Sequence, residues 1–345
     1  MKQPGQKQMT RPARISYWFI FLTIVCVGWL HLATPLLAAL FSYFVLNKLR
    51  FGTRGKWLPA SLFIIVILGA SSGLAYFANH SIKALPKIIE TTIPSIITWA
   101  DAHDIDLPFD DFQELKAQAM NMAKEAKYVG NFADYAKILT TQVIFLIIGC
   151  VVALSLFFNA QVVLDRASHK VKHNLYATCA DEIAQRFQSF YHSFVTVMGA
   201  QIIISSINTA LTSVFVFAVS LPHAVVIIGV TFLCGMLPVI GNLVSNTIIV
   251  AISFTVSPNL ALGALAFLIG IHKLEYFLNS KIIGDRIKNP IWLTLLGLIL
   301  GEKLMGVPGM ILAPVILNYL KMESSRIEVA PPVMEPVVSG SLPEK

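Results

Sequence analysis

The chain has 345 residues, of which 56% are hydrophobic and only 13% charged, whereas soluble domains carry about 25% charged residues. This composition excludes an ordinary soluble protein and indicates a membrane protein with apolar helices of about 20 residues each. The formal net charge of +7 is explained by basic loops held in the cytoplasm, so no nucleic-acid partner is expected.

The first 78 residues are predicted to form a basic cytoplasmic end followed by membrane helices. Residues 1–15 contain no acidic side chain, which places them in the cytoplasm. Within residues 16–78, two short helices are expected to turn near His31–Pro35 and return, because basic residues flank both ends of the pair. A single long tilted helix is the alternative. A crossing over Trp57–Phe77 follows. No small-residue cleavage site follows the first apolar stretch, so we expect it to remain as an anchor.

Residues 79–137 are the main polar region, and their acidic residues outnumber their lysines. They are therefore predicted to form an extracytoplasmic helical region. Apolar residues recur at helical spacing around Pro86 and Pro94, which is typical of amphipathic helices on a membrane surface. A capping box at Asp111–Glu114 introduces a heptad stripe over Phe112–Val129. The stripe predicts either packing within the chain or a contact between subunits of a homo-oligomer.

Residues 138–158 are predicted to cross back as a transmembrane helix, and residues 159–194 to form a cytoplasmic helical segment. In that segment His169 and His173 are spaced as zinc ligands are on a helix. The glutamate of an HExxH motif is absent and no third ligand is apparent, so no metal site is expected.

Residues 195–320 are predicted to form a transport core with two apolar stretches broken by proline and glycine, at Gly235–Asn242 and Gly301–Gly309. Loop charges place both ends of the first stretch outside and both ends of the second inside. Each stretch would then be a re-entrant hairpin, and the two tips would meet near mid-membrane. Two kinked, tilted helices are the alternative. Residues 321–345 are rich in proline and are predicted to be a disordered cytoplasmic tail.

These elements together predict an all-α polytopic membrane protein. It would have about eight membrane-embedded helical segments, including the two re-entrant hairpins, and a small extracytoplasmic helical region.

Polar residues in the predicted core mark a candidate pathway for a substrate and an ion. A stripe at i, i+4, i+7 and i+11 suits either helix–helix hydrogen bonding or a pathway, and it consists of Gln201, Ser205, Asn208 and Thr212. A second face, at i, i+3 and i+7, consists of His272, Glu275 and Asn279. A charge at mid-membrane costs about 2.5–3.5 kcal/mol, so Glu275 should face a partner or water. The two breaks add Pro238, Gly241, Asn242, Gly306 and Gly309.

At these residues the sequence resembles the autoinducer-2 exporter (AI-2E) family of bacterial membrane transporters. Its motifs are similar to Pro238–Gly241, to Leu274-Glu275, to Ile282–Gly284 with the following Asn289-Pro290, and to Gly306–Pro314. The opening Thr34–Arg50 is also similar to the family's start. Three positions depart from the family pattern: Asn242 stands where a second proline is common, His272 where a glutamine is common, and Ser280 where a proline is frequent.

The resemblance implies a secondary transporter in the bacterial cytoplasmic (inner) membrane that exports a small polar signal molecule or metabolite. A sodium(cation)/proton antiporter, with Glu275 and His272 as the proton site, is the alternative within the family. A non-transporting membrane scaffold is the further alternative. No catalytic triad order or Walker loop supports an enzyme, and no cofactor is expected. The expected partners are the solute, H+ or Na+, the lipid bilayer and further copies of the chain in a ring-like homo-oligomer.

Overall fold

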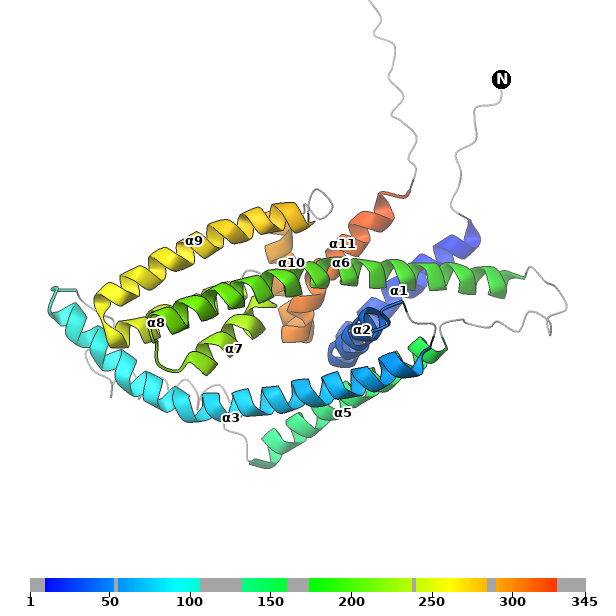
Figure 1. The fold of residues 1–345 in the computed structure, drawn as a ribbon. Helices are drawn as coiled ribbons and strands as arrows, with labels where there is room; N and C mark the ends of the chain where they lie inside the picture. The colour runs from blue at the N-terminus through cyan, green and yellow to red at the C-terminus, as the bar shows by residue number, and fades with distance from the viewer. Residues whose placement is uncertain are drawn as a thin grey trace, which may run out of the picture.

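The computed structural model describes residues 10–52, 55–105, 132–159, 174–237, 240–283 and 290–327, and within these ranges the regular elements are all helices (Figure 1). They are α1 (Arg11–Trp29), α2 (Ala33–Lys48), α3 (Trp57–Asp101), α5 (Phe132–Phe158), α6 (Leu175–Ala218), α7 (Ala224–Gly235), α8 (Ile240–Val256), α9 (Pro258–Ile283), α10 (Ile291–Met305) and α11 (Val307–Ser324). The predictions for Asp111–Glu114, Phe112–Val129, His169, His173 and Pro238 lie outside the described residues.

Four stretches of the described helices are long and apolar enough to cross a membrane: α1, Trp57–Ala84 of α3, Thr140–Phe158 of α5, and α6. Helices α7 and α8 are apolar but shorter. Large apolar side chains on α3 and α5 are well exposed, as lipid-facing residues are; Leu68 is 63% exposed and Ile147 57%. The all-helical membrane class is therefore confirmed, and the total of about eight embedded segments stays a prediction.

The N-terminal turn falls where the sequence places it. Helix α1 ends at Trp29, His31 adopts a left-handed φ of 53°, and α2 begins at Ala33, which excludes a single long helix. The two helices then pack on different partners, α1 on α6 and α2 on α5. A Cβ at Gly149 of α5 would overlap Ala38 of α2, so glycine permits this close approach.

Two helices are longer than the sequence suggested. Helix α3 runs through Pro86 and Pro94 to Asp101 instead of ending near Phe77, and Figure 1 shows it as one long bent helix. Proline removes a backbone hydrogen bond and bends a helix without always ending it. Helix α6 likewise passes the expected boundary at residue 194, because buried Phe194 and Met198 on both sides of that boundary belong to the same core cluster.

The two broken stretches form two pairs of packed short helices, α7 with α8 and α10 with α11. Helices α7 and α8 contain 12 and 17 residues, which corresponds to lengths of about 18 and 26 Å at 1.5 Å per residue. Both are shorter than the hydrocarbon core of about 30 Å. Between α10 and α11, Gly306 adopts φ 65° and ψ −150°, a conformation that a side chain disfavours.

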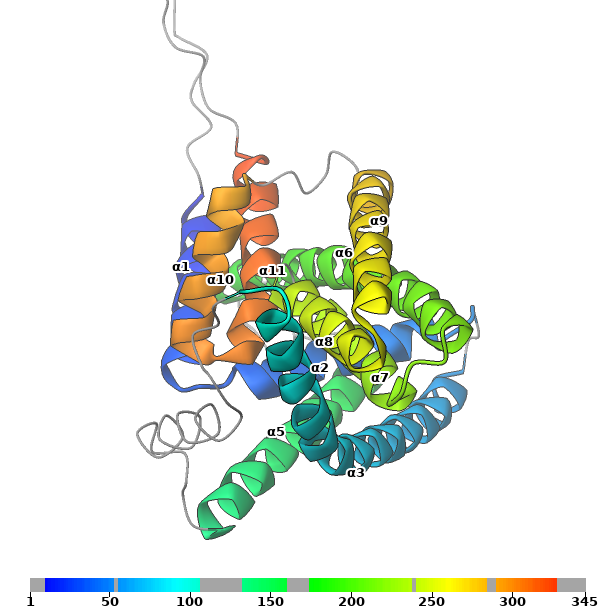
Figure 2. The ribbon, with the colours of Figure 1, turned by 90° about the vertical axis from the view of Figure 1, so that its left-hand side faces the viewer.

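Helix α6 connects two groups of helices. Its first half packs with α1, α2 and α11 around Phe194, and its second half packs with α3, α7, α8 and α9 around Ile227. Figure 2 shows α1, α10 and α11 side by side on the left, and α7, α8 and α9 together on the right. Helix α6 therefore contributes residues to both packed clusters.

The predicted tail begins later than residue 321. Helix α11 continues to Ser324, and the side chain of Glu323 is nearly fully buried. Arg326 donates a hydrogen bond to Ser189 Oγ at 2.9 Å, which holds the chain after α11 against α6. Residues 328–345 of the predicted tail lie outside the described part.

Candidate functional site

The carboxylate of Glu275 on α9 is bound by amide side chains from two other helices. Oε2 of Glu275 accepts a hydrogen bond from Asn242 Nδ2 of α8 at 2.6 Å and a longer one from Asn208 Nδ2 of α6 at 3.4 Å. His272 Nδ1, one turn away on α9, lies 3.7 Å from the same oxygen. The Glu275 side chain is 15% exposed, so this carboxylate is mostly buried where three helices meet.

This arrangement is sensitive to the charge of the carboxylate. Hydrogen bonds to an ionised acceptor are about twice as strong as neutral ones, so loss of the charge on Glu275 would weaken both amide contacts. His272 attracts the carboxylate only when the imidazole is protonated, and its side chain is 46% exposed. The cluster therefore has the components needed to take up a proton or a cation at Glu275 and to change how α6, α8 and α9 are held together.

Asn208 brings a further polar atom to the cluster. Its side chain is 6% exposed, and its Oδ1 atom has no hydrogen-bond partner among the described residues. The hydroxyl oxygen of the next residue, Thr209, is also buried and has no hydrogen-bond partner among the described residues. A buried acceptor without a partner costs about 1–3 kcal/mol. A water, an ion or a polar solute beside Asn208 would recover that cost.

Gln201 and Ser205, the first two residues of the polar stripe on α6, hydrogen-bond to the end of α7. Gln201 Nε2 donates to the carbonyl oxygen of Gly235 at 2.6 Å, and Ser205 Oγ donates to that of Phe232 at 2.8 Å. The last carbonyl groups of a helix have no partner inside the helix, so these two contacts satisfy groups that the break leaves open. Gln201 and Ser205 therefore fix the first break against α6, in agreement with helix–helix hydrogen bonding.

Glycine is required at this break for space. A Cβ at Gly235 would lie 2.6 Å from Ser205 Oγ, and a Cβ at Gly241 would overlap the carbonyl oxygen of Cys234. Close contact between the end of α7 and the start of α8 is what places Asn242, the next residue, within reach of Glu275.

We call Glu275 and the three residues around its carboxylate, Asn208, Asn242 and His272, the Glu275 cluster. The second break is not part of this cluster among the described residues. A Cβ at Gly309 would overlap the carbonyl of Gly301, so Gly309 serves the close packing of α10 on α11. Gly306 provides the turn. The two breaks nevertheless share a neighbourhood, because Met236 of the first and Met305 of the second pack on the same core cluster.

The structure thus joins only some of the predicted site residues. Asn208, Asn242, His272 and Glu275 meet around one carboxylate oxygen. Thr212 is 1% exposed within the helix packing, and the side chain of Asn279 lies outside the described part.

A second charged cluster was missed from the sequence. Glu323 near the end of α11 accepts hydrogen bonds from Arg186 Nη1 at 2.7 Å, from Arg326 Nη1 at 3.1 Å and from the hydroxyl of Tyr17 at 3.0 Å. Arg186 also pairs with Glu182 at 2.9 Å. We call these five residues the Glu323 cluster; it ties α1, α6 and α11 together. The sequence offered one signal, the i,i+4 spacing of Glu182 and Arg186.

Comparison with known proteins agrees with the resemblance carried by the motifs. The family model described as AI-2E family transporter matches residues 15–325, which include the Glu275 cluster and, except for Arg326, the Glu323 cluster. The chain belongs to the AI-2E transporter family. A protein of Bacillus subtilis (strain 168) with the printed name "Putative transport protein YdbI" is 29% identical over 142 residues. That alignment covers 41% of this AI-2E transporter and 41% of the Bacillus protein.

Proposed function

We propose that this AI-2E transporter is a multi-pass secondary transporter of the bacterial inner membrane that exports a small polar signal molecule or metabolite similar to autoinducer-2. The observation that carries the proposal is the mostly buried Glu275 carboxylate, which is bound by Asn242 and Asn208 from two other helices. Ionisable groups at membrane depth are costly and commonly mark substrate or ion pathways.

In this proposal the two pairs of short helices are re-entrant hairpins that enter from opposite faces, with residues 79–137 outside and both termini in the cytoplasm. The lengths of α7 and α8 support it, because neither alone spans the hydrocarbon core. Broken helices with open backbone groups are found in transporters beside the substrate. The Glu275 cluster lies directly after the first break, where Asn242 follows Gly241.

Export is tested in proteoliposomes loaded with a panel of small polar solutes, including autoinducer-2, under imposed sodium or proton gradients. The proposal predicts that at least one solute leaves faster than from protein-free liposomes, and that a gradient changes its rate. Equal efflux from both kinds of liposome, for every solute and gradient, would refute export.

A sodium(cation)/proton antiporter is the second candidate, and one observation favours it. The His272 Nδ1 atom lies 3.7 Å from the Glu275 carboxylate. In the antiporter proposal this pair of titratable groups binds a proton and releases it when a cation binds at the carboxylate. The test is sodium-driven proton movement across empty proteoliposomes, followed with a pH-sensitive dye. Proton movement without any added solute would favour the antiporter, and its absence together with solute efflux would favour the exporter.

The transporter is further proposed to act as a ring-like homo-oligomer, on the basis of the heptad stripe that the sequence carries over Phe112–Val129. A mass measurement on protein extracted in a mild detergent tests this assembly. A monomer under those conditions would contradict it.

A further inference from the structure

The contact between the first half of α6 and the end of α11 contains buried polar side chains. The sulfur atom of Met322 on α11 accepts a hydrogen bond from Ser193 Oγ of α6 at 3.6 Å and another from Asn318 Nδ2 of α11 at 3.7 Å. Ser193 is 0% exposed and Asn318 1%, and a thioether sulfur is a weak acceptor. We call Ser189, Ser193, Asn318, Tyr319 and Met322 the α6–α11 polar interface.

Three buried polar atoms in and beside this interface have no hydrogen-bond partner among the described residues. They are Asn318 Oδ1, the hydroxyl of Tyr319 and Nε of Arg186. Protein interiors pair nearly all such atoms with protein groups or ordered water, and each unpaired atom raises the free energy of the packed state. The packing of α11 on α6 is therefore less favourable here than an apolar contact of the same shape would be. Water would stabilise an arrangement in which the two helices have moved apart.

The Glu323 cluster holds the outer end of the α6–α11 polar interface closed. Glu323 of α11 accepts hydrogen bonds from Arg186 of α6 at 2.7 Å and from the hydroxyl of Tyr17 of α1 at 3.0 Å. Arg326, after α11, donates to Ser189 of α6 at 2.9 Å. In the proposed topology this end of α1, α6 and α11 is the cytoplasmic end. These contacts would have to break before α11 could move away from α6.

Apolar side chains close the inner end of the same interface. Gln201, which binds the first break, lies eight residues beyond Ser193 on α6, or about 12 Å at 1.5 Å per residue. Between the two lies a part of the core cluster that α6 and α11 share, made of Phe194, Val197, Met198, Leu312 and Val315. Apolar constrictions of this kind close a pathway by excluding water.

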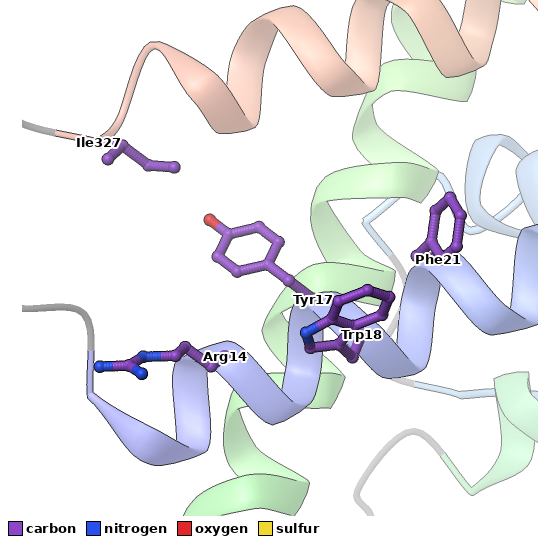
Figure 3. A pocket seen from close by; sticks show the side chains of 5 residues that line it. All are labelled: Arg14, Tyr17, Trp18, Phe21 and Ile327. Carbon is purple, nitrogen blue, oxygen red and sulfur yellow. The ribbon is translucent and has the colours of Figure 1, made fainter.

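A pocket beside Tyr17 provides space for the outer contacts to open. It has a volume of about 350 Å³, and its lining includes Tyr17, Trp18 and Phe21 of α1 and Ile327 directly after α11. Figure 3 shows the Tyr17 side chain extending from α1 towards the end of α11, with Ile327 across the pocket. Tyr17 therefore has open space beside it into which it could turn when it leaves Glu323.

We propose that the α6–α11 polar interface is the cytoplasmic entrance of the transport pathway, which is closed in this structure. Release of the Glu323 cluster would admit water and a small polar solute between α6 and α11, as far as the apolar side chains that precede Gln201. The proposal rests on the transport function and the topology proposed above. It adds an entrance about 20 Å or more along α6 from the Glu275 cluster, because 15 residues separate Ser193 from Asn208.

The test is the rate at which a cysteine at this interface reacts with a charged, membrane-impermeant methanethiosulfonate reagent. Ser193→Cys is introduced into the full chain, and the reagent is added to inverted vesicles, which expose the cytoplasmic face. Peptide mass spectrometry measures the modification at residue 193, so the four native cysteines remain in place. We expect modification to become about tenfold faster or more when Glu323→Gln is added, because that change breaks a buried ion pair.

A milder variant keeps the test decisive if Glu323→Gln does not insert. Tyr17→Phe loses the hydroxyl contact with Glu323 but keeps the ring under Arg186, so it should accelerate the modification in the same direction by a smaller factor. An unchanged rate at residue 193 in each variant that inserts would overturn the proposal. Modification that occurs only from the outer face, in right-side-out vesicles, would also overturn it.

Two controls separate an opening of this interface from a general loosening. Ser253→Cys, at a serine of α8 that is also 0% exposed, should stay unmodified in the same backgrounds, and an equal acceleration there would overturn the proposal. Backbone hydrogen exchange along α11 should stay slow, and fast exchange would show unfolding of the helix end instead. Solute efflux is measured separately. Modification at residue 193 without efflux of any solute would refute the transport function alone, and efflux with an unreactive residue 193 would refute the entrance alone.

Discussion

Removal of the charge on Glu323 should loosen the contact among α1, α6 and α11. The Glu323 side chain is 4% exposed and its Arg186 partner 13%, so Glu323→Gln breaks a buried ion pair. Breaking such a pair typically costs about 3–5 kcal/mol. We expect the lower end, about 3 kcal/mol, because Arg186 keeps Glu182 at 2.9 Å and Arg326 is half exposed.

The assay is thermal unfolding of the purified protein in detergent at one scan rate. A loss of about 3 kcal/mol corresponds to a decrease in Tm of about 4 °C for a chain of this size, at an unfolding entropy of about 2.1 cal/mol/K per residue. Glu302→Gln is the matched control, because Glu302 pairs with Lys303 while 47% exposed and should shift Tm by less than about 2 °C. The double variant Arg186→Gln/Glu323→Gln should lose less than the sum of the two single variants. A Tm for Glu323→Gln equal to that of Glu302→Gln would refute the reasoning.

Two further predictions concern the break between α7 and α8 and the link between α6 and α7. Gly241→Ala should lower Tm, because the added Cβ would overlap the carbonyl group of Cys234. Gly263→Ala is the control: there is open space around Gly263, and alanine has the higher helix propensity, so Tm should rise slightly. Equal changes in Tm for the two variants would contradict this prediction. Burial, with the charges of His80 and Lys87, lowers the pKa of His223 in the α6–α7 link from 6.5. Because His223 resists protonation in the folded state, its environment lowers stability only when the pH falls below about 6.5. Hydrogen exchange at the start of α7, corrected for intrinsic rates, should therefore become faster in acid. His223→Asn, which tolerates the left-handed backbone, should remove that rise, and an unchanged acid response would count against it.

The sequence was informative where a polar residue interrupts an apolar run. The sequence predicted that Glu275 of α9 should face a partner or water, and in the structure its Oε2 atom accepts a hydrogen bond from Asn208 Nδ2 of α6. The turn near His31 was predicted from the basic residues at both ends of one apolar stretch, and the structure has α2 beginning at Ala33.

Sequence reasoning failed where tertiary packing decides the outcome. Pro86 and Pro94 suggested interruptions, but α3 continues through both as a bent helix. In the sequence Glu323 lies at the beginning of the predicted tail, where a charged side chain is usually exposed. In the structure it is buried and accepts a hydrogen bond from Tyr17, 306 positions away along the chain. Gln201 and Ser205 could be assigned to a polar stripe but not to the carbonyl groups at the end of α7, because helical spacing does not reveal the partner.

The central claim, that Glu275 is the charge-changing group of the transport site, is tested most directly by Glu275→Gln. Glutamine keeps the shape and can still accept hydrogen bonds from Asn242 and Asn208, but it removes the change of charge. Transport of the solute carried by the wild-type protein is measured in proteoliposomes across a range of pH, with Glu90→Gln, an exposed site on α3, as the matched control. We predict that Glu275→Gln inserts and assembles normally but loses coupled transport, while Glu90→Gln retains it. Wild-type transport by Glu275→Gln with an unchanged pH dependence would make Glu275 a structural residue and contradict the account.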